Sequence, residues 1–187
     1  MRRTLHLATQ RAMQRSPPPL HRARYDELFS FLWGVKRVQT ELQSVWASQT
    51  TTGAMPPARR AALMPLWRLR AHMSFVVDNL QYYLQVDVLD VQWLKLTRAA
   101  EEHADFEALV AAHEDCLAAL HAQCFLQAGA VSSALHQILQ LCLSLCRMLS
   151  YADVGAASQA MYHAQLETLQ REFARQSAFL FAFLSNM

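Results

Sequence analysis

The sequence predicts an all-α fold, a helical bundle of about five long helices. Of its 187 residues, 53% are hydrophobic and 17% are charged, whereas an average soluble domain has about 25% charged residues. A chain of this size can bury one substantial core. It has only 4 glycines and 6 prolines, and no proline follows Pro65. Apolar residues recur at spacings of three and four, without runs that alternate like strands, so long helices are expected.

The first helix is predicted over residues 25–47. Six apolar residues fall on one helical face at the required spacing: Leu28, Leu32, Val35, Val38, Leu42 and Val45. Four aromatic residues widen this stripe: Phe29, Phe31, Trp33 and Trp46. The next segment, Ala47 to Ala62, contains three threonines, a glycine and two prolines, so an exposed loop is expected there.

The second helix is predicted to begin near Pro65, a residue that the first helical turn tolerates, and to reach Arg98 or beyond. Its apolar positions form two rows, Met73, Val76, Leu80, Tyr83 and Val77, Leu84, Val88, Val91. A helix that is apolar over more than half its circumference must touch neighbours on two sides. Core packing is also the expected role of aromatic residues at helical spacing, namely Trp33, Trp46, Phe75, Tyr82, Tyr83 and Trp93.

Three further helices follow. The first covers Asp105 to Gln127, with Asp105 as its N-terminal cap and Gly129 as its terminator. The others cover residues 131–149, which should be the most enclosed, and 156–184. The apolar run 135–149 is about fifteen residues long, and a membrane span needs about twenty, so a buried core helix and no membrane span are expected.

Residues 1–20 are expected to be a flexible basic lead-in. Six arginines precede the first acidic residue, Asp26. A mitochondrial presequence has the same composition and stays open as the less favoured alternative, whereas a secretory signal is not visible, which favours an intracellular protein. The net charge of +2 is small and the basic residues are scattered, so nucleic acid is not expected as a partner.

Few residues suggest chemistry. Three pairs could place zinc ligands on one helix face, His113 with Cys116, His121 with Cys124, and Cys142 with Cys146. Such residues are more often buried core groups, so no metal is expected. No glycine-rich nucleotide loop or nucleophile motif occurs, so neither a cofactor nor a catalytic residue is predicted. Two function classes stay open, a helical interaction module and a helical enzyme without a readable motif.

Four segments together resemble the carboxy-terminal domain of the gamma-tubulin complex components, most closely that of the fourth component. They are "YDELFSFLWGVKRVQTELQSVW" (25–46), "LWRLRAHMSFVVDNLQYYLQVDVLDVQWLKL" (66–96), "DFEALVAAHEDCLAALHAQCFL" (105–126) and "FARQSAFLFAFLS" (173–185). The resemblance implies a helical domain that binds gamma-tubulin and is not an enzyme. It also implies assembly with other complex components, microtubule nucleation, and a place in the cytoplasm and cytoskeleton at a microtubule-organising centre, the centrosome or spindle pole.

The sequence departs from the family in two respects. "PPPLHRARY" has Pro18 where the family usually has tryptophan, and its connection to the first helix is short. The sequence contains no counterpart of the family's lateral-packing amino-terminal domain, which suggests a fragment, a truncated gene model or a short isoform. Residues 21–187 are expected to be the gamma-tubulin-binding domain of a longer architecture.

Four residues of the second helix are predicted to lie on or near the gamma-tubulin surface: Arg70, Asn79, Gln81 and Tyr82. They interrupt the apolar rows, and interfaces favour Arg and Tyr. The alternative is that these side chains are only solvated, with Tyr82 in the core.

Overall fold

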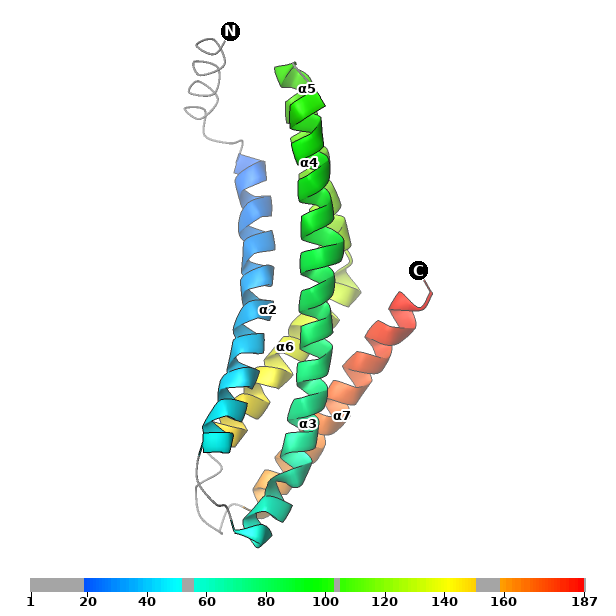
Figure 1. Cartoon of the computed structure of the whole chain (residues 1–187). Coiled ribbons are helices and arrows are strands. Elements are labelled where there is room, and N and C mark those ends of the chain that lie inside the picture. The colour runs from blue at the N-terminus through cyan, green and yellow to red at the C-terminus, as the bar shows by residue number, and fades with distance from the viewer. Residues whose placement is uncertain (1–18, 52–55, 103–104, 151–158, 187) are drawn as a thin grey trace.

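The computed structural model describes residues 19–51, 56–102, 105–150 and 159–186. These ranges contain helices and short turns and no strand, which confirms the all-α prediction. The elements are α2 (Pro19–Thr51), α3 (Pro57–Tyr82), η1 (Tyr83–Asp90), α4 (Val91–Glu102), α5 (Phe106–Gln123), α6 (Gly129–Ser150) and α7 (Gln159–Leu184). Because η1 is a π-helix that joins α3 to α4 without a break, the described chain forms five helical rods (Figure 1).

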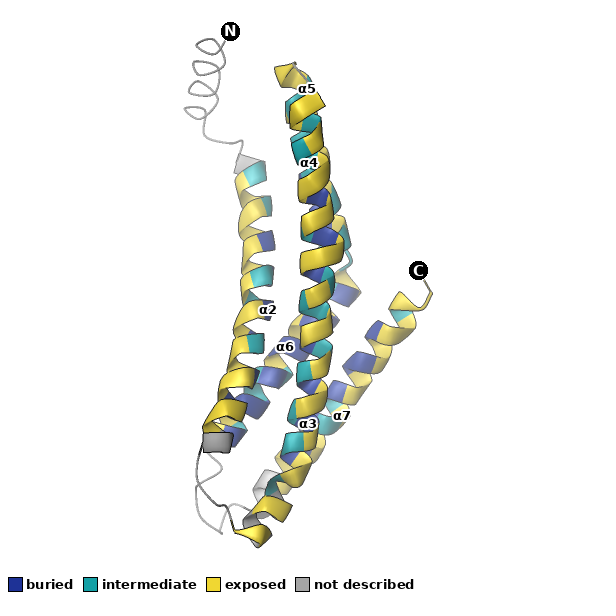
Figure 2. Ribbon diagram, viewed as in Figure 1, coloured by how far each residue is buried: buried dark blue, intermediate teal, exposed yellow. Residues whose placement is uncertain are grey.

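Helix α6 lies at the centre of the bundle and contacts α2, α3 and α7. The α4–α5 hairpin packs on itself and extends past the end of α6 (Figure 1). Buried apolar residues from the helices form one continuous core. The ribbon positions of buried residues are marked in Figure 2. The largest fully buried members of the core include Val35, Leu42, Met73, Val77, Ile138, Leu145 and Phe173.

The apolar run 135–149 is a core helix, as predicted. It belongs to α6, in which Leu135, Ile138, Cys142, Leu145 and Leu149 are buried. By length and composition alone α6 could cross a membrane, and it is the one such helix in the described part of the chain. A core helix of a soluble protein passes the same test, and packing on three neighbours accounts for its apolar character.

The prediction of a loop over residues 47–62 was wrong at both of its ends. Helix α2 continues to Thr51, and α3 already begins at Pro57, while residues 52–55 lie outside the described ranges. Pro57 occupies the first turn of α3, where its missing N–H has no intrahelical partner to lose. Pro65 therefore lies inside the helix rather than at its start. Burial of Leu66 and Leu69 stabilises the helix across this proline.

The remaining bounds differ by a few residues. Helix α2 begins at Pro19, six residues before the predicted start at Tyr25, and α7 is described from Gln159. Asp105 caps α5 as predicted, because its carboxylate accepts a hydrogen bond from the Glu107 N–H at 3.3 Å. Of the expected lead-in over residues 1–20, Pro19 and Leu20 belong to α2. Residues 1–18, which the alternative presequence also concerns, lie outside the described ranges.

Gly129 does not terminate α5, contrary to prediction, since it is the first residue of α6. The helix ends instead at Gln123, and two residues later Phe125 has a φ of 59°, in the left-handed region. The Phe125 N–H bonds the Ala122 carbonyl at 3.1 Å and the Leu126 N–H bonds the His121 carbonyl at 3.1 Å. This is the Schellman pattern, which usually has glycine at the left-handed position. Here the aromatic ring is buried, stacked 6.0 Å from Tyr83, and the packing outweighs the backbone cost.

We expect the protein with Phe125→Gly to be more stable than the protein with Phe125→Ala by about 1–2 kcal/mol, the cost of a left-handed backbone for an L side chain. Both variants lose the buried ring, so both should be less stable than the parent. Urea unfolding followed by circular dichroism measures the three free energies. Equal stability of the two variants would show that the φ of 59° imposes no strain.

Candidate partner-binding surface

Several aromatic side chains predicted for the core are on the surface. The exposed fractions are 61% for Phe75, 63% for Tyr82, 62% for Trp33 and 69% for Trp93. Spacing places a residue on a helix face but does not say whether another helix covers that face. An uncovered aromatic face is a feature of interaction surfaces rather than of an isolated bundle.

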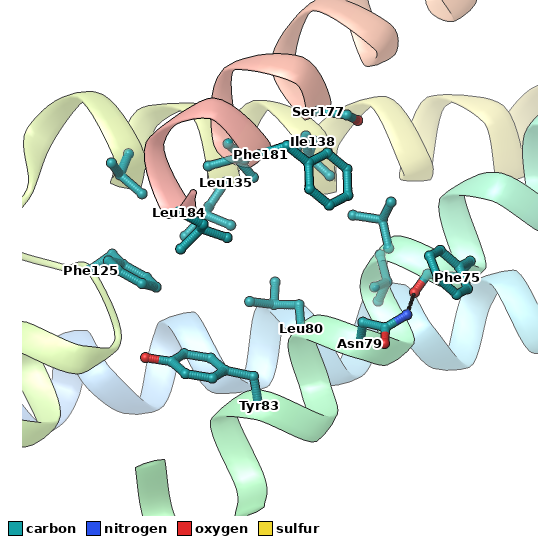
Figure 3. A pocket seen from close by; sticks show the side chains of 14 residues that line it. Phe75, Asn79, Leu80, Tyr83, Phe125, Leu135, Ile138, Ser177, Phe181 and Leu184 are labelled. Atoms are coloured by element: carbon teal, nitrogen blue, oxygen red, sulfur yellow. Dashed lines mark hydrogen bonds between the residues drawn. The ribbon is translucent and has the colours of Figure 1, made fainter. Parts of the chain in front are cut away.

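An apolar groove lies between α3 and α7, with α6 as its floor (Figure 3). Its volume is about 360 Å³, within the usual range of ligand pockets. Tyr83 and Phe125 face each other at one end, and Phe181 and Leu184 approach from α7. The lining residues are Phe75, Val76, Val77, Asn79, Leu80, Tyr83, Phe125, Val131, Leu135, Ile138, Ser177, Leu180, Phe181 and Leu184.

The polar side chains of the groove all bond to the main chain. The Asn79 amide donates to the Phe75 carbonyl at 2.6 Å, and the Ser177 hydroxyl donates to the Phe173 carbonyl at 2.7 Å. The Tyr83 hydroxyl donates to the Gln123 carbonyl at 3.0 Å. Burial is the main cause that raises the pKa of Tyr83, and the charges of Cys124 and Asp87 raise it further. No carboxylate, histidine, lysine or arginine is among the lining residues. The groove is thus suited to apolar contact rather than to proton transfer.

The structure separates the four predicted site residues. Asn79 lines the groove, and Tyr82 is exposed three residues further along. Together with Phe75 they lie at spacings of four and three on one helix face, which we call the α3 ridge. Gln81 is half-buried and is not among the groove residues.

Arg70 is turned toward α2. Its Nε donates to the Leu42 carbonyl at 3.0 Å, and its guanidinium lies 5.1 Å from the centre of the Trp46 ring. Burial lowers the pKa of Arg70, while the nearby Cys146 and Asp78 act in the opposite direction. The side chain therefore joins α3 to α2, and its first role is in the bundle.

Arg70→Ala is expected to lower the free energy of unfolding by about 1–3 kcal/mol, because it removes a charge-assisted hydrogen bond and a cation–π contact. The matched control is Arg68→Ala, two residues away on an exposed position, which should change stability by less than about 0.5 kcal/mol. Thermal or urea unfolding measures both. Similar losses in the two variants would contradict the role of Arg70 in joining α3 to α2.

Of the residues considered as zinc ligands, His113 and Cys116 are half-buried and the other four are buried. Within the described ranges no three His, Cys, Asp or Glu residues are grouped so that they could hold a metal ion. Cys124, Cys142 and Cys146 are buried and free, and the buried His121 bonds the Arg24 carbonyl through Nε2 at 2.8 Å. Burial raises the pKa of Cys124 to about 11. Burial, with Glu41 as a smaller cause, raises that of Cys146 to about 11.

These thiols predict a loss of stability in alkali. An unfolded cysteine has a pKa of about 8.5, so the folded protein retains protons that the unfolded chain releases. The stabilisation should be complete below about pH 8.5 and should decline as the pH rises toward 11. Unfolding at pH 8 and pH 10 under reducing conditions measures the decline. Cys146→Ala should reduce this pH dependence, and an unchanged dependence would assign it to other groups.

The chain matches the family described as "Gamma tubulin complex component C-terminal" over residues 19–187. Gamma-tubulin complex component 4 of Homo sapiens is 42% identical over 164 residues, covering 88% of this chain and 24% of the relative. Gamma-tubulin complex component 4 of Arabidopsis thaliana is 34% identical, with 88% and 23% covered. Spindle pole body component 98 of Dictyostelium discoideum is 32% identical over 98 residues, with 50% and 12% covered.

The fold and the surface define the class of protein: it is an all-helical bundle that has an apolar groove beside an aromatic helix face. The chain belongs to the gamma-tubulin complex component family, through its C-terminal domain. This confirms the resemblance found in the sequence, including that to the fourth component. The chain spans about a quarter of the length of the component 4 relatives.

Proposed function

We propose that residues 21–187 form a gamma-tubulin-binding domain that acts in the gamma-tubulin complex and supports microtubule nucleation. The family match over residues 19–187 and the names of the relatives support this proposal. The function requires no cofactor and no catalytic residue. The chain's part is to present a shaped surface to another protein.

One observation carries the proposal, the exposed α3 ridge beside the apolar groove. Phe75 and Tyr82 are 61% and 63% exposed, although each could bury a large apolar area. Protein interfaces are enriched in aromatic residues and depleted of charged residues at their centres. The groove residues have this composition, so binding of gamma-tubulin over the ridge would remove the exposed rings from water.

Of the four predicted contact residues, we assign Asn79 and Tyr82 to the gamma-tubulin surface. They share the ridge with Phe75, which is why we place the contact there. Arg70 is assigned a supporting role, since it bonds to α2. Gln81 is placed at the margin of the contact, because its side chain is partly buried in the bundle and does not line the groove.

Assembly with other gamma-tubulin complex components belongs to the same proposal, as does a location in the cytoplasm and cytoskeleton at a microtubule-organising centre, the centrosome or spindle pole. The relatives named as complex components and as a spindle pole body component support it. Side-by-side packing into a ring would involve parts of the relatives that this chain does not match.

The alternative of a helical enzyme requires polar groups that converge on a pocket and have perturbed pKa values. The groove provides Asn79, Ser177 and Tyr83, each of which already bonds to a carbonyl of the main chain. A surface whose polar groups are satisfied internally favours a binding role over catalysis.

The test is retention of purified gamma-tubulin by the tagged full chain, with αβ-tubulin as the matched control. Selective retention of gamma-tubulin is the expected result. Circular dichroism must show a helical chain in the same preparation. A helical chain that retains neither tubulin, or both equally, would refute the proposal.

A further inference from the structure

The α4–α5 hairpin is joined to the rest of the molecule by two connections that lie side by side. One is η1, and the other is the turn from Cys124 to Ala128. Tyr83, the first residue of η1, stacks on Phe125 at 6.0 Å and donates its hydroxyl to the Gln123 carbonyl at 3.0 Å. The two connections lie side by side, so the hairpin could rotate about the line that joins them without stretching either connection.

The packing partners of the long rod change at the same level. Below it, α3 contacts α2 and α6, and above it, α4 contacts α5. In the upper part Gln92 is 3% exposed and bonds Gln123 at 3.0 Å, while the Cys116 thiol lies 3.8 Å from the Gln92 carbonyl. The hairpin thus has internal contacts of its own between α4 and α5.

The π geometry of η1 supplies the freedom at this level. A π-helix bonds residue i to i+5, so it contains one residue more than the α-helix that would span the same turn. Gln85 and Asp90, five apart, bond at 2.9 Å. In an α-helix two such residues are about 140° apart around the axis, so this bond fits only the π form. At the lower junction the Tyr83 N–H is shared by the Asn79 and Leu80 carbonyls, and at the upper one the Val91 N–H bonds the Val88 carbonyl.

A third contact, between α5 and the first turns of α2, combines the buried apolar residues Leu28 and Leu120 with several polar pairs. The Tyr25 hydroxyl and His113 Nε2 are 2.7 Å apart, and His21 Nε2 lies 3.5 Å from a Glu114 oxygen. His121 Nε2 bonds the Arg24 carbonyl at 2.8 Å. The Tyr25–His113 and His21–Glu114 contacts are partly exposed and can exchange with water when the helices shift, whereas His121 is buried.

We propose that η1 is a hinge at which the α4–α5 hairpin moves as one body relative to the bundle of α2, α3, α6 and α7. Its axis passes through η1 and the Phe125 turn. As the hinge bends, the backbone hydrogen bonds around the additional residue of η1 break and re-form. The polar contacts between α5 and α2 stabilise one position of the hairpin. This inference does not depend on what the bundle binds.

The experiment measures the distance between a spin label at Ala100 on α4 and one at Gln140 on α6, both exposed. Labels are placed on cysteines in the full chain with Cys116→Ser, since the other three thiols are buried. The control pair, Ser44 on α2 and Gln140, lies within the bundle. A hinge predicts a broad or two-peaked distribution for the first pair and a single narrow peak for the control pair.

Deletion of Val86, an exposed residue of η1, should close the segment as a continuous α-helix. The Ala100–Gln140 distribution should then collapse to one narrow peak. If the deleted chain does not fold, Gln85→Ala replaces it, and loss of the π-specific bond should shift the populations of the two peaks. The hinge is refuted if the first pair is as narrow as the control pair, or if neither change alters the distribution.

Discussion

Phe173→Ala is expected to lower the free energy of unfolding by about 3–5 kcal/mol, a large part of the stability of a domain of this size. Phe173 is fully buried, with an exposed fraction of 0%. Its ring meets that of His72 edge-on at 5.2 Å, so it helps to hold α7 close to α3. Truncation leaves a cavity where these helices meet, and rigid neighbours close such a cavity only in part.

The matched control is Phe179→Ala, which removes the same side chain six residues later on α7. Phe179 is 41% exposed, so its truncation loses less buried area and creates no enclosed cavity. We expect a loss of less than about 1 kcal/mol. Urea unfolding followed by circular dichroism compares the two variants. Equal losses would mean that α7 is not seated on the bundle as described.

Helix faces could be predicted from the sequence because periodicity reports directly on burial. Val35 and Val38 in α2 and Met73 and Val77 in α3 were placed on core faces, and all are 0% or 1% exposed. Helix ends were harder to predict. Pro57 and Pro65 both fit a first turn, and the choice depends on whether the next turn gains enough packing to continue across the second proline.

Two local features could not be read from residue patterns. In η1 the buried Leu84 and Val88 are four residues apart, a spacing that an α-helix would also have. The additional residue therefore cannot be recognised from the sequence, although the structure shows it in the π-helical backbone and in the pairing of Gln85 with Asp90. Phe125 occupies a left-handed position that local rules assign to glycine. The stacking of Phe125 on Tyr83 stabilises this conformation, and the sequence does not reveal it because the two residues are far apart in the chain.

The candidate site was predicted only in part for a related reason. Arg70 and Asn79 both interrupt the apolar rows of α3, and a single helix gives no means to separate them. The structure does so, because α2 approaches Arg70 and leaves Asn79 on the groove. The exposed ring of Phe75 was missed, since its spacing is also that of a core residue. The sequence could have indicated an exposed aromatic residue only through its total number of apolar residues, which is larger than one core of this size needs.

Tyr82→Ala combined with Asn79→Ala is expected to weaken gamma-tubulin binding by about tenfold to a hundredfold, if the α3 ridge is at the centre of the contact. An aromatic residue there contributes about 1–3 kcal/mol on truncation, and each 1.4 kcal/mol is a factor of ten. Both side chains are exposed, so unfolding experiments should show little change in stability. Binding of the purified proteins, measured by calorimetry or interferometry, gives the ratio of dissociation constants.

Trp33→Ala is the matched control, because Trp33 is 62% exposed, nearly the same as Tyr82, but lies on α2 and is not among the groove residues. Its truncation removes a larger ring from the surface and should leave the affinity within about twofold, since a residue outside an interface has no binding energy to lose. The comparison separates a specific contact from general stickiness of exposed aromatics. If Trp33→Ala weakened binding while the double variant did not, gamma-tubulin would contact the outer side of α2, and the ridge would need another partner to cover it.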